Sequence, residues 1–268
     1  MPINLDISRL NDNNDNPDAN WKLFPIKRGK RLLRNVLRLL YGTRGMICGG
    51  FARWLASPNP SPIPFNDIDI YCQTVADYDR TKAQLLAHGL KVEFETEIAT
   101  TFQSYRLDWF RKYPIQLIKP IHEDKLVTYG TLKEVIGNFD FSVIRAGVVS
   151  QIEVLADCYF AEDEKNQVLR LQRISCPLAQ SIRIAKYHKK GYRVPPNLYL
   201  EVLKEWDKLS TTEKKRAADS LEEIKLQNPF GQGKITTNNA WQAAEDYERV
   251  ESTQSYYRHH RYRKSDEW

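Results

Sequence analysis

Residues 46–72, MICGGFARWLASPNPSPIPFNDIDIYC, constrain the fold more than any other part of the sequence. This stretch begins with a short apolar run, passes two adjacent glycines and continues as the helix-forming segment FARWLA. It ends in an alternation of apolar and acidic residues. Short apolar runs bounded by turn residues are typical of buried strands. The pattern therefore predicts a strand, a tight glycine turn, a short helix and a second strand.

Two acids, Asp67 and Asp69, flank Ile68 in the second predicted strand. Side chains alternate between the two faces of a strand, so both carboxylates should point the same way while Ile68 and Ile70 enter the core. Neighbouring carboxylates repel each other unless a cation lies between them. Oxygen ligands of this kind suit Mg²⁺ or Mn²⁺ that also carries substrate phosphates. We therefore expect Asp67 and Asp69 to be metal ligands.

The two glycines, Gly49 and Gly50, close the first strand and open the helix. A glycine turn lets backbone N–H groups and a helix N-terminus approach an anion such as a triphosphate. Arg53, one turn into the helix, is placed to reach the same anion. Together with the paired acids, these residues indicate phosphoryl or nucleotidyl transfer, in which a two-metal clamp stabilises the attacking and leaving oxygens.

These elements resemble the polymerase β-like nucleotidyltransferase superfamily. Its mark is an apolar strand ending in Gly-Gly or Gly-Ser, a short helix, and a strand that alternates apolar and acidic residues; here ICGGFARWLA and NDIDIYC carry the likeness. The Gly-Gly-x-x-Arg variant is similar to that of poly(A) polymerases and CCA-adding enzymes. The whole arrangement is most similar to the small stand-alone nucleotidyltransferases of phages and large viruses. YPIQLIK, NFDFSVIRAG and SIRIAKYHKKGYRVP extend the resemblance over roughly residues 45–195.

The resemblance implies an α+β fold, in which a mixed-sheet catalytic core is followed by a helical C-terminal part. It implies two Mg²⁺ ions, with Mn²⁺ as a substitute, an NTP such as ATP, and an acceptor hydroxyl that displaces pyrophosphate. It also implies nucleotide contacts by Arg183, Lys186 and Tyr187, with Lys186 on phosphates and Tyr187 on a base. The alternative for this last segment is ordinary helix packing with solvated cations.

The family's third carboxylate, which helps to activate the acceptor hydroxyl, is expected on the strand YPIQLIK. Its place near Pro114 holds no acid. Asp140 and Asp108 are the candidates to replace it, and Asp140 is favoured because an acid between two phenylalanines on an apolar strand needs a role. The alternative for Asp140 is an acid that caps the preceding turn. If neither acid reaches the metals, the chain would be a non-catalytic nucleotide- or nucleic-acid-binding module.

The charge balance favours an anionic partner. Forty Lys and Arg against 34 Asp and Glu give a formal net charge of +6. A predicted basic helix follows residue 26, and the C-terminal tail mixes arginines with tyrosines, which suits single-stranded nucleic acid. A solvated helix face and a disordered tail are the alternatives. We expect RNA, in particular tRNA, as the acceptor; a protein side chain or a small molecule remains an alternative.

The signals along the chain divide it into four parts: residues 1–42 with the basic helix, 43–165 as the catalytic domain, 166–250 as helices, and 251–268 as the tail. Further strands are predicted over LKVEFETE, TTFQSYRLDWF, YPIQLIK and FDFSVIRAGVVS. The four dispersed cysteines form no CxxC, and no apolar run is long enough for a membrane span. The five histidines have no ligand or triad spacing. We therefore expect a cytoplasmic protein with no membrane partner, whereas the oligomeric state is not indicated.

Overall fold

A computed structural model describes residues 20–95, 99–104, 108–122, 125–126, 130–174 and 177–215. The tail at 251–268 and the last predicted helix, NNAWQAAEDYERVE, lie outside the described residues. The structural statements below concern the described part of the chain.

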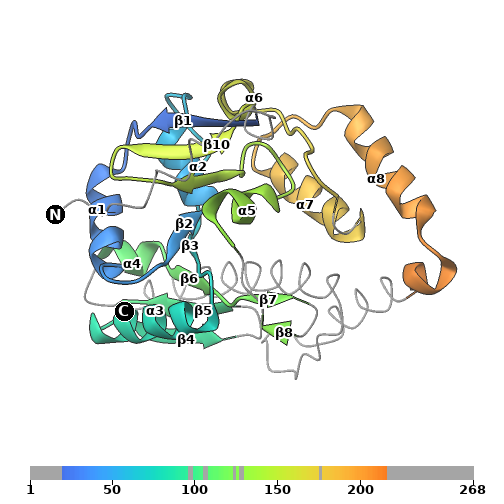
Figure 1. Ribbon diagram of the computed structural model, residues 1–268. Helices are drawn as coiled ribbons and strands as arrows, with labels where there is room; N and C mark the ends of the chain where they lie inside the picture. The colour runs from blue at the N-terminus through green and yellow to red at the C-terminus, as the bar shows by residue number, and fades with distance from the viewer. Residues whose placement is uncertain are drawn as a thin grey trace, which may run out of the picture.

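A mixed sheet of eight strands forms the centre of the protein (Figure 1). Its strands, in spatial order, are β1 (Trp21–Pro25), β10 (Glu153–Asp157), β9 (Ala146–Val148), β2 (Met46–Cys48), β3 (Ile68–Tyr71), β6 (Ile115–Ile118), β5 (Ala99–Gln103) and β4 (Lys91–Glu95). Neighbouring strands are antiparallel except β3 and β6, which are parallel. Two short strands, β7 (Ile121–His122) and β8 (Lys125–Leu126), form a separate hairpin. The predicted α+β class and mixed sheet are confirmed.

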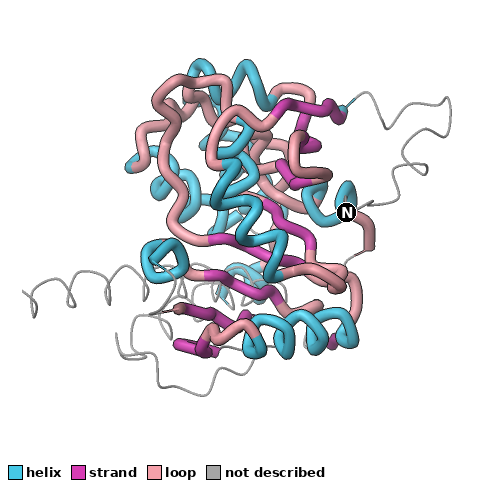
Figure 2. The backbone as a smooth tube through the Cα atoms, turned by 90° about the vertical axis from the view of Figure 1, so that its left-hand side faces the viewer, coloured by secondary structure: helices cyan, strands magenta, loops and turns pink. Residues whose placement is uncertain are grey.

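Eight helices of the described chain surround this sheet. They are α1 (Lys30–Leu39), α2 (Gly50–Ala56), α3 (Val75–Ala87), α4 (Asp108–Lys112), α5 (Leu132–Gly137), α6 (Phe160–Asn166), α7 (Pro177–Lys189) and α8 (Pro196–Lys208). Figure 1 shows α7 and α8 on the opposite side of the molecule from α1. Seen from the α1 side, the strands follow one another across the molecule with helices in front of them (Figure 2). None of the described helices is long and apolar enough to cross a bilayer.

The two faces of the sheet bury different residues. On one face, Ile68 and Ile70 of β3 pack with Leu33 of α1 and Phe51 of α2 in the largest apolar cluster. On the other face, Cys48, Tyr71 and Ile118 pack with Val135 and Ile136 of α5. A third cluster joins α7 and α8 to Phe141 and Val143. Strand alternation thus commits the apolar residues of β3 to the first face and its odd-numbered positions to the α5 face.

Two predicted strands differ from the observed structure. The strand predicted over residues 100–110 ends at Gln103, and Asp108 begins helix α4, whose Phe110 is buried in the core. The strand predicted over residues 139–150 shortens to β9, because the N–H groups of Ile144 and Arg145 both bond to the carbonyl of Phe141 and close a turn. Asp140 therefore lies in a connection between α5 and β9.

Three elements were not predicted: β1, β10 and α6. Strands β1 and β10 pair along their full five-residue lengths, from Trp21 opposite Asp157 to Pro25 opposite Glu153. Residues from Trp21 onward therefore belong to the same sheet as the predicted catalytic domain. Each of these strands is too short, and β1 too close to a proline, for its period to stand out in the sequence.

Candidate active site

The paired acids lie at the middle of the sheet, on the face covered by α5. Asp69 is the second residue of β3 and Asp67 directly precedes the strand, and their side chains are 4% and 5% exposed. Ile68 and Ile70 enter the opposite core. The predicted alternation is thus observed, and Asp67 and Asp69 share one face of one strand.

The strand register sets a row of side chains on this face. Asp69 lies opposite Cys48 of β2 on one side and opposite Gln116 of β6 on the other. Gln116 in turn lies opposite Thr101 of β5. We call Cys48, Asp69, Gln116 and Thr101 the carboxylate row. All four side chains are buried.

The thiol at one end of this row is sensitive to the acid beside it. Burial, and to a smaller extent the negative charge of Asp69, raise the pKa of Cys48 well above its usual value. Cys48 therefore remains a protonated, apolar-like neighbour at neutral pH. It brings no further charge to the row.

The glycine turn approaches the acids closely. Gly49 has φ 72° and ψ −136°, a region that side chains with a Cβ rarely adopt, and a Cβ built there would lie 3.2 Å from Oδ2 of Asp69. The N–H of Gly49 donates to the carbonyl of Ala146 at 2.8 Å. Gly49 therefore admits the carboxylate to the turn, but its N–H is committed within the sheet. Gly50 starts α2, and a Cβ on it would meet only Phe65, at 3.9 Å.

Arg53 does not face the acids, which corrects the predicted contact with the triphosphate. Its side chain is buried; Nη1 forms an ion pair with Glu164 at 3.3 Å and donates to the hydroxyl of Tyr192. Its Nη2 donates to the carbonyls of Ile63 and Pro64, at 2.5 and 3.3 Å. Arg53 points away from the glycine turn because α2 directs this position toward α6. Its donors anchor the end of the proline-rich loop that leads to Asp67.

Asp140, the favoured third acid, contacts an arginine. Its Oδ2 accepts a hydrogen bond from Nη1 of Arg183 on α7, and its backbone carbonyl accepts the N–H of Gln172 at 2.8 Å. The side chain of Asp140 is fully buried, whereas that of Arg183 is partly exposed. This ion pair ties the α5–β9 connection to α7. Arg183, predicted to contact the nucleotide, is thus partly neutralised by Asp140.

The other two residues predicted on α7 lie one turn farther along. The ring of Tyr187 makes edge contacts with Phe141 at 5.3 Å and Tyr192 at 5.7 Å, and the ammonium of Lys190 lies 5.3 Å from its centre. Tyr187 therefore packs on the third core cluster, which agrees with the alternative of helix packing. Lys186 is half-buried on the same helix. Their nucleotide contacts stay predictions.

The position expected to hold the third acid is occupied by an amide. The N–H of Ile68 donates to the carbonyl of Pro114 at 2.9 Å, and two residues later Gln116 lies directly beside Asp69. Gln116 is fully buried and was not singled out from the sequence. The available signal was its position as the one polar residue in the strand IQLI. Asp108 lies in α4 and not on a strand of the row.

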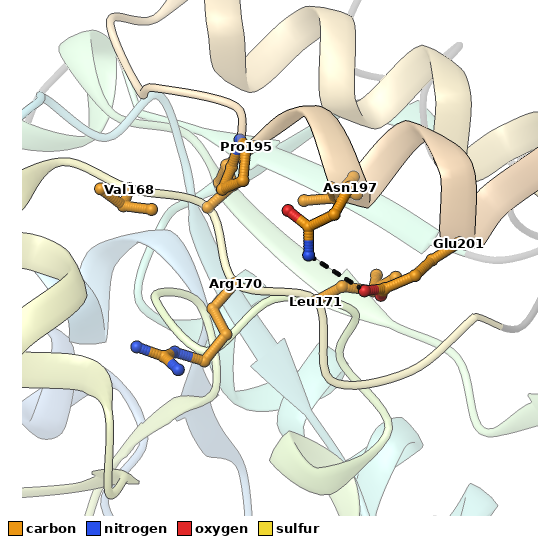
Figure 3. Close-up of a pocket in the computed structure, with 8 residues that line it drawn as sticks. Val168, Arg170, Leu171, Pro195, Asn197 and Glu201 are labelled. Atoms are coloured by element: carbon orange, nitrogen blue, oxygen red, sulfur yellow. Dashed lines mark hydrogen bonds between the residues drawn. The ribbon is translucent and has the colours of Figure 1, made fainter.

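A pocket of about 350 Å³ lies elsewhere, between residues 168–171 and the start of α8 (Figure 3). Figure 3 shows Arg170 and Leu171 opposite Asn197 and Glu201, which are joined by a hydrogen bond of 3.3 Å. The pocket includes neither acid of β3 and no member of the carboxylate row. It therefore gives no support to a role in the chemistry of the paired acids.

The residues of the carboxylate face fit a hard cation with few protein ligands. No group of three or more His, Cys, Asp or Glu side chains capable of holding a metal is found within the described part of the chain. Asp67 and Asp69 thus offer two carboxylates. Mg²⁺ is often bound by one or two carboxylates and completed by water and substrate phosphates, so this donor set fits it.

Comparisons with known proteins give similarities in structure only. The sequence matches no model of a known protein family, and no curated protein matches it. A structure described as a tRNA-processing enzyme in an apo form is 17% identical, with a TM-score of 0.47; the match covers 76% of this chain and 51% of that one. The Thermotoga maritima CCA-adding enzyme in complex with tRNA is 14% identical, with a TM-score of 0.44 and coverage of 81% and 58%.

A third structure, a tRNA nucleotidyltransferase with a primer tRNA and an incoming ATP analogue, is 15% identical, with a TM-score of 0.42 and coverage of 87% and 60%. The chain therefore spans between about half and three-fifths of the length of these structures. All three are described as enzymes that act on tRNA, and two are nucleotidyltransferases by name.

Proposed function

We propose that this protein is a divalent-metal-dependent nucleotidyltransferase that moves an NMP from an NTP to an acceptor hydroxyl and releases pyrophosphate. The observation that carries the proposal is the burial of Asp67 and Asp69 on one face of β3, beside a glycine turn that only a residue without a Cβ can adopt comfortably. Two buried like charges at this spacing are stabilised when a cation joins them.

Each part of the site has a role in such a transfer. Asp67 and Asp69 would hold Mg²⁺, which binds triphosphate oxygens and polarises the α-phosphorus. The turn at Gly49 keeps the backbone close to Asp69 without a side chain between them. The acceptor oxygen forms the new bond to the α-phosphorus, the bond to the β-phosphate oxygen breaks, and the hydroxyl proton is released. Gly50, at the start of α2, is the proposed backbone contact for the triphosphate.

RNA is the proposed acceptor, and tRNA the form we favour. Residues 20–66 contain no Asp or Glu. Seven cations of this segment are exposed on β1, α1 and their flanks: Lys22, Lys27, Lys30, Arg31, Arg34, Arg38 and Arg44. A one-sign surface of this size attracts a polyanion such as an RNA backbone.

A non-catalytic nucleotide-binding module is the second candidate. It is favoured by one observation, the neutral side chain of Gln116 where an acid would serve the acceptor hydroxyl. Such a protein would bind an NTP with a divalent ion and transfer nothing.

Both candidates are tested by incubating the protein with total RNA, Mg²⁺ and each labelled NTP in turn. Label incorporated into RNA by the wild-type chain, but not by the Asp67→Asn/Asp69→Asn variant, is the expected result. NTP binding without transfer to RNA, to the protein itself or to small-molecule hydroxyls would favour the binding module. Absence of NTP binding would refute both.

A further inference from the structure

Gln116 is a buried amide whose polar atoms lack partners in the described structure. Its side chain is 0% exposed, and neither Oε1 nor Nε2 makes a hydrogen bond. A glutamine amide carries an acceptor oxygen and two N–H donors, and buried groups of this kind are almost always bonded. The missing partner of Gln116 is therefore a group that the protein chain does not supply.

The position of Gln116 identifies the kind of partner. Adjacent strands lie about 4.8 Å apart, and Gln116 is directly beside Asp69 across the parallel β3–β6 pair. Its neighbours Ile115 and Leu117 belong to the opposite core, so the amide shares the face of Asp67 and Asp69. A cation held by two carboxylates supplies what the amide oxygen lacks, and a phosphate oxygen supplies what the N–H groups lack.

We propose that Gln116 is the third residue of the Asp67–Asp69 site, with Oε1 toward the divalent cation and Nε2 toward a phosphate oxygen of the bound nucleotide. This inference rests on the proposed function and deepens it. Amide oxygens are accepted ligands of hard cations, although weaker than carboxylates.

The neutrality of Gln116 has a consequence for metal content. Asp67 and Asp69 contribute two negative charges, which match one divalent cation, and the third member of the site adds none. The site therefore holds one divalent ion per protein–nucleotide complex. This departs from the two ions that the resemblance implies.

The test uses the full chain, Mn²⁺ and a non-hydrolysable ATP analogue, with calorimetry for affinity and electron paramagnetic resonance for the number of bound ions. The wild-type complex should hold one Mn²⁺. Gln116→Met keeps the length of the side chain and removes both polar atoms. We expect it to weaken Mn²⁺ binding in the presence of the analogue by about tenfold, as loss of a supporting partner at a metal site does.

A second measurement separates this role from a purely structural one. If Gln116 serves the ligand, Gln116→Met should not lower the unfolding midpoint in EDTA, because an apolar side chain replaces an unpaired amide in the core. A lower midpoint in EDTA with unchanged Mn²⁺ affinity would overturn the proposal. Two Mn²⁺ ions in the wild-type complex would also overturn it.

Gln180→Met is the matched control, because Gln180 is also buried, also lacks hydrogen bonds in the described structure, and lies on α7 instead of the sheet. It should leave Mn²⁺ affinity unchanged; equal weakening in both variants would contradict a specific role for Gln116. Gln116→Glu adds the absent charge, and should raise the count to two ions per complex. An unchanged count would refute the charge argument.

The outcome for the acids distinguishes the two levels of the argument. If Asp67→Asn/Asp69→Asn abolishes Mn²⁺ and nucleotide binding while Gln116→Met has no effect, only the inference about Gln116 fails. If the double variant binds both as well as the wild type, the proposed function fails as well.

Discussion

Two groups of buried charged side chains differ in how their charges are balanced. We call Arg53, Ser57, Glu164 and Tyr192 the arginine cluster. There, Arg53 pairs with Glu164, Ser57 donates to the same carboxylate at 2.7 Å, and the hydroxyl of Tyr192 donates to it as well. On the other face of β3, Asp67 and Asp69 place two like charges beside a neutral amide, Gln116.

The comparison separates structural from ligand-binding charges by their internal balance. Burial raises the pKa of Tyr192 far above its usual value, so its hydroxyl stays protonated and keeps donating to Glu164. The arginine cluster is thus complete without a ligand, and it joins α2, α6 and the segment that precedes α8. The acid pair has no such internal balance among its row neighbours. A cation would complete it.

The largest expected effect follows from removing the unbalanced charges. Asp67→Asn/Asp69→Asn should abolish Mg²⁺-dependent NTP affinity in calorimetry and reduce transfer by a factor on the order of 10³ or more, because amides do not neutralise a dication. The same variant should unfold at an equal or higher denaturant concentration in EDTA, since like-charge repulsion is removed. NTP affinity that persists at wild-type strength in EDTA would place the nucleotide site elsewhere.

The arginine cluster should respond in the opposite way. Arg53→Met leaves Glu164 buried without its cation and should lower the free energy of unfolding by about 3–5 kcal/mol, measured by denaturant titration. Added to this variant, Glu164→Gln should recover part of the loss, because no net charge then remains buried. Fully additive losses would contradict the charge-balance explanation.

The glycine turn tests the geometry between the two groups. Gly49→Ala must adopt a conformation that disfavours a Cβ and places it 3.2 Å from Asp69 Oδ2, so we expect a loss of about 1–3 kcal/mol in stability together with weaker Mn²⁺ binding. The adjacent Gly50→Ala is the matched control. Its Cβ has room and its backbone is helical, so stability should change little or rise. Equal effects at both positions would argue against a special role for Gly49.

The sequence was sufficient to predict the elements whose side-chain period is unambiguous. The glycine turn, the acids of β3 and their shared face follow from spacing alone, because alternation on a strand is a local property. The same holds for α1, whose apolar stripe is buried and whose cations are exposed.

The rest depends on contacts between distant residues. The partner of Arg53, Glu164, is 111 residues away, so a helical position one turn beyond the glycines did not reveal that it points inward. Asp140 was favoured as the third acid because the strand expected around it placed it beside the metals; a turn and an arginine on α7 determine its position instead. The role of Gln116 depends on the register of β3 and β6, which no local pattern specifies.

Asp140 gives a smaller test of the same distinction, because its charge is balanced by Arg183. Asp140→Asn should lower stability by about 1 kcal/mol, since the partly exposed arginine can turn toward water. Transfer and NTP affinity should stay within tenfold of the wild type. A loss of transfer on the order of 10² with folding and NTP affinity intact would instead support Asp140 as the base for the acceptor hydroxyl.

The smallest effect is expected from charges that are exposed and of one sign, on α1. Arg34 and Arg38 lie one turn apart on its exposed face, in a segment without acids. If this face contacts RNA phosphates, Arg34→Gln/Arg38→Gln should reduce the slope of log affinity against log salt by roughly 1.5, because each neutralised phosphate contributes about 0.7–0.9. Filter binding of tRNA across salt concentrations measures this slope. Lys91→Gln/Arg111→Gln removes two exposed charges from β4 and α4 and is the charge-matched control. Equal slopes for the two variants would mean that net charge, and not the α1 face, governs RNA binding, whereas salt-insensitive binding would favour a protein or small-molecule acceptor.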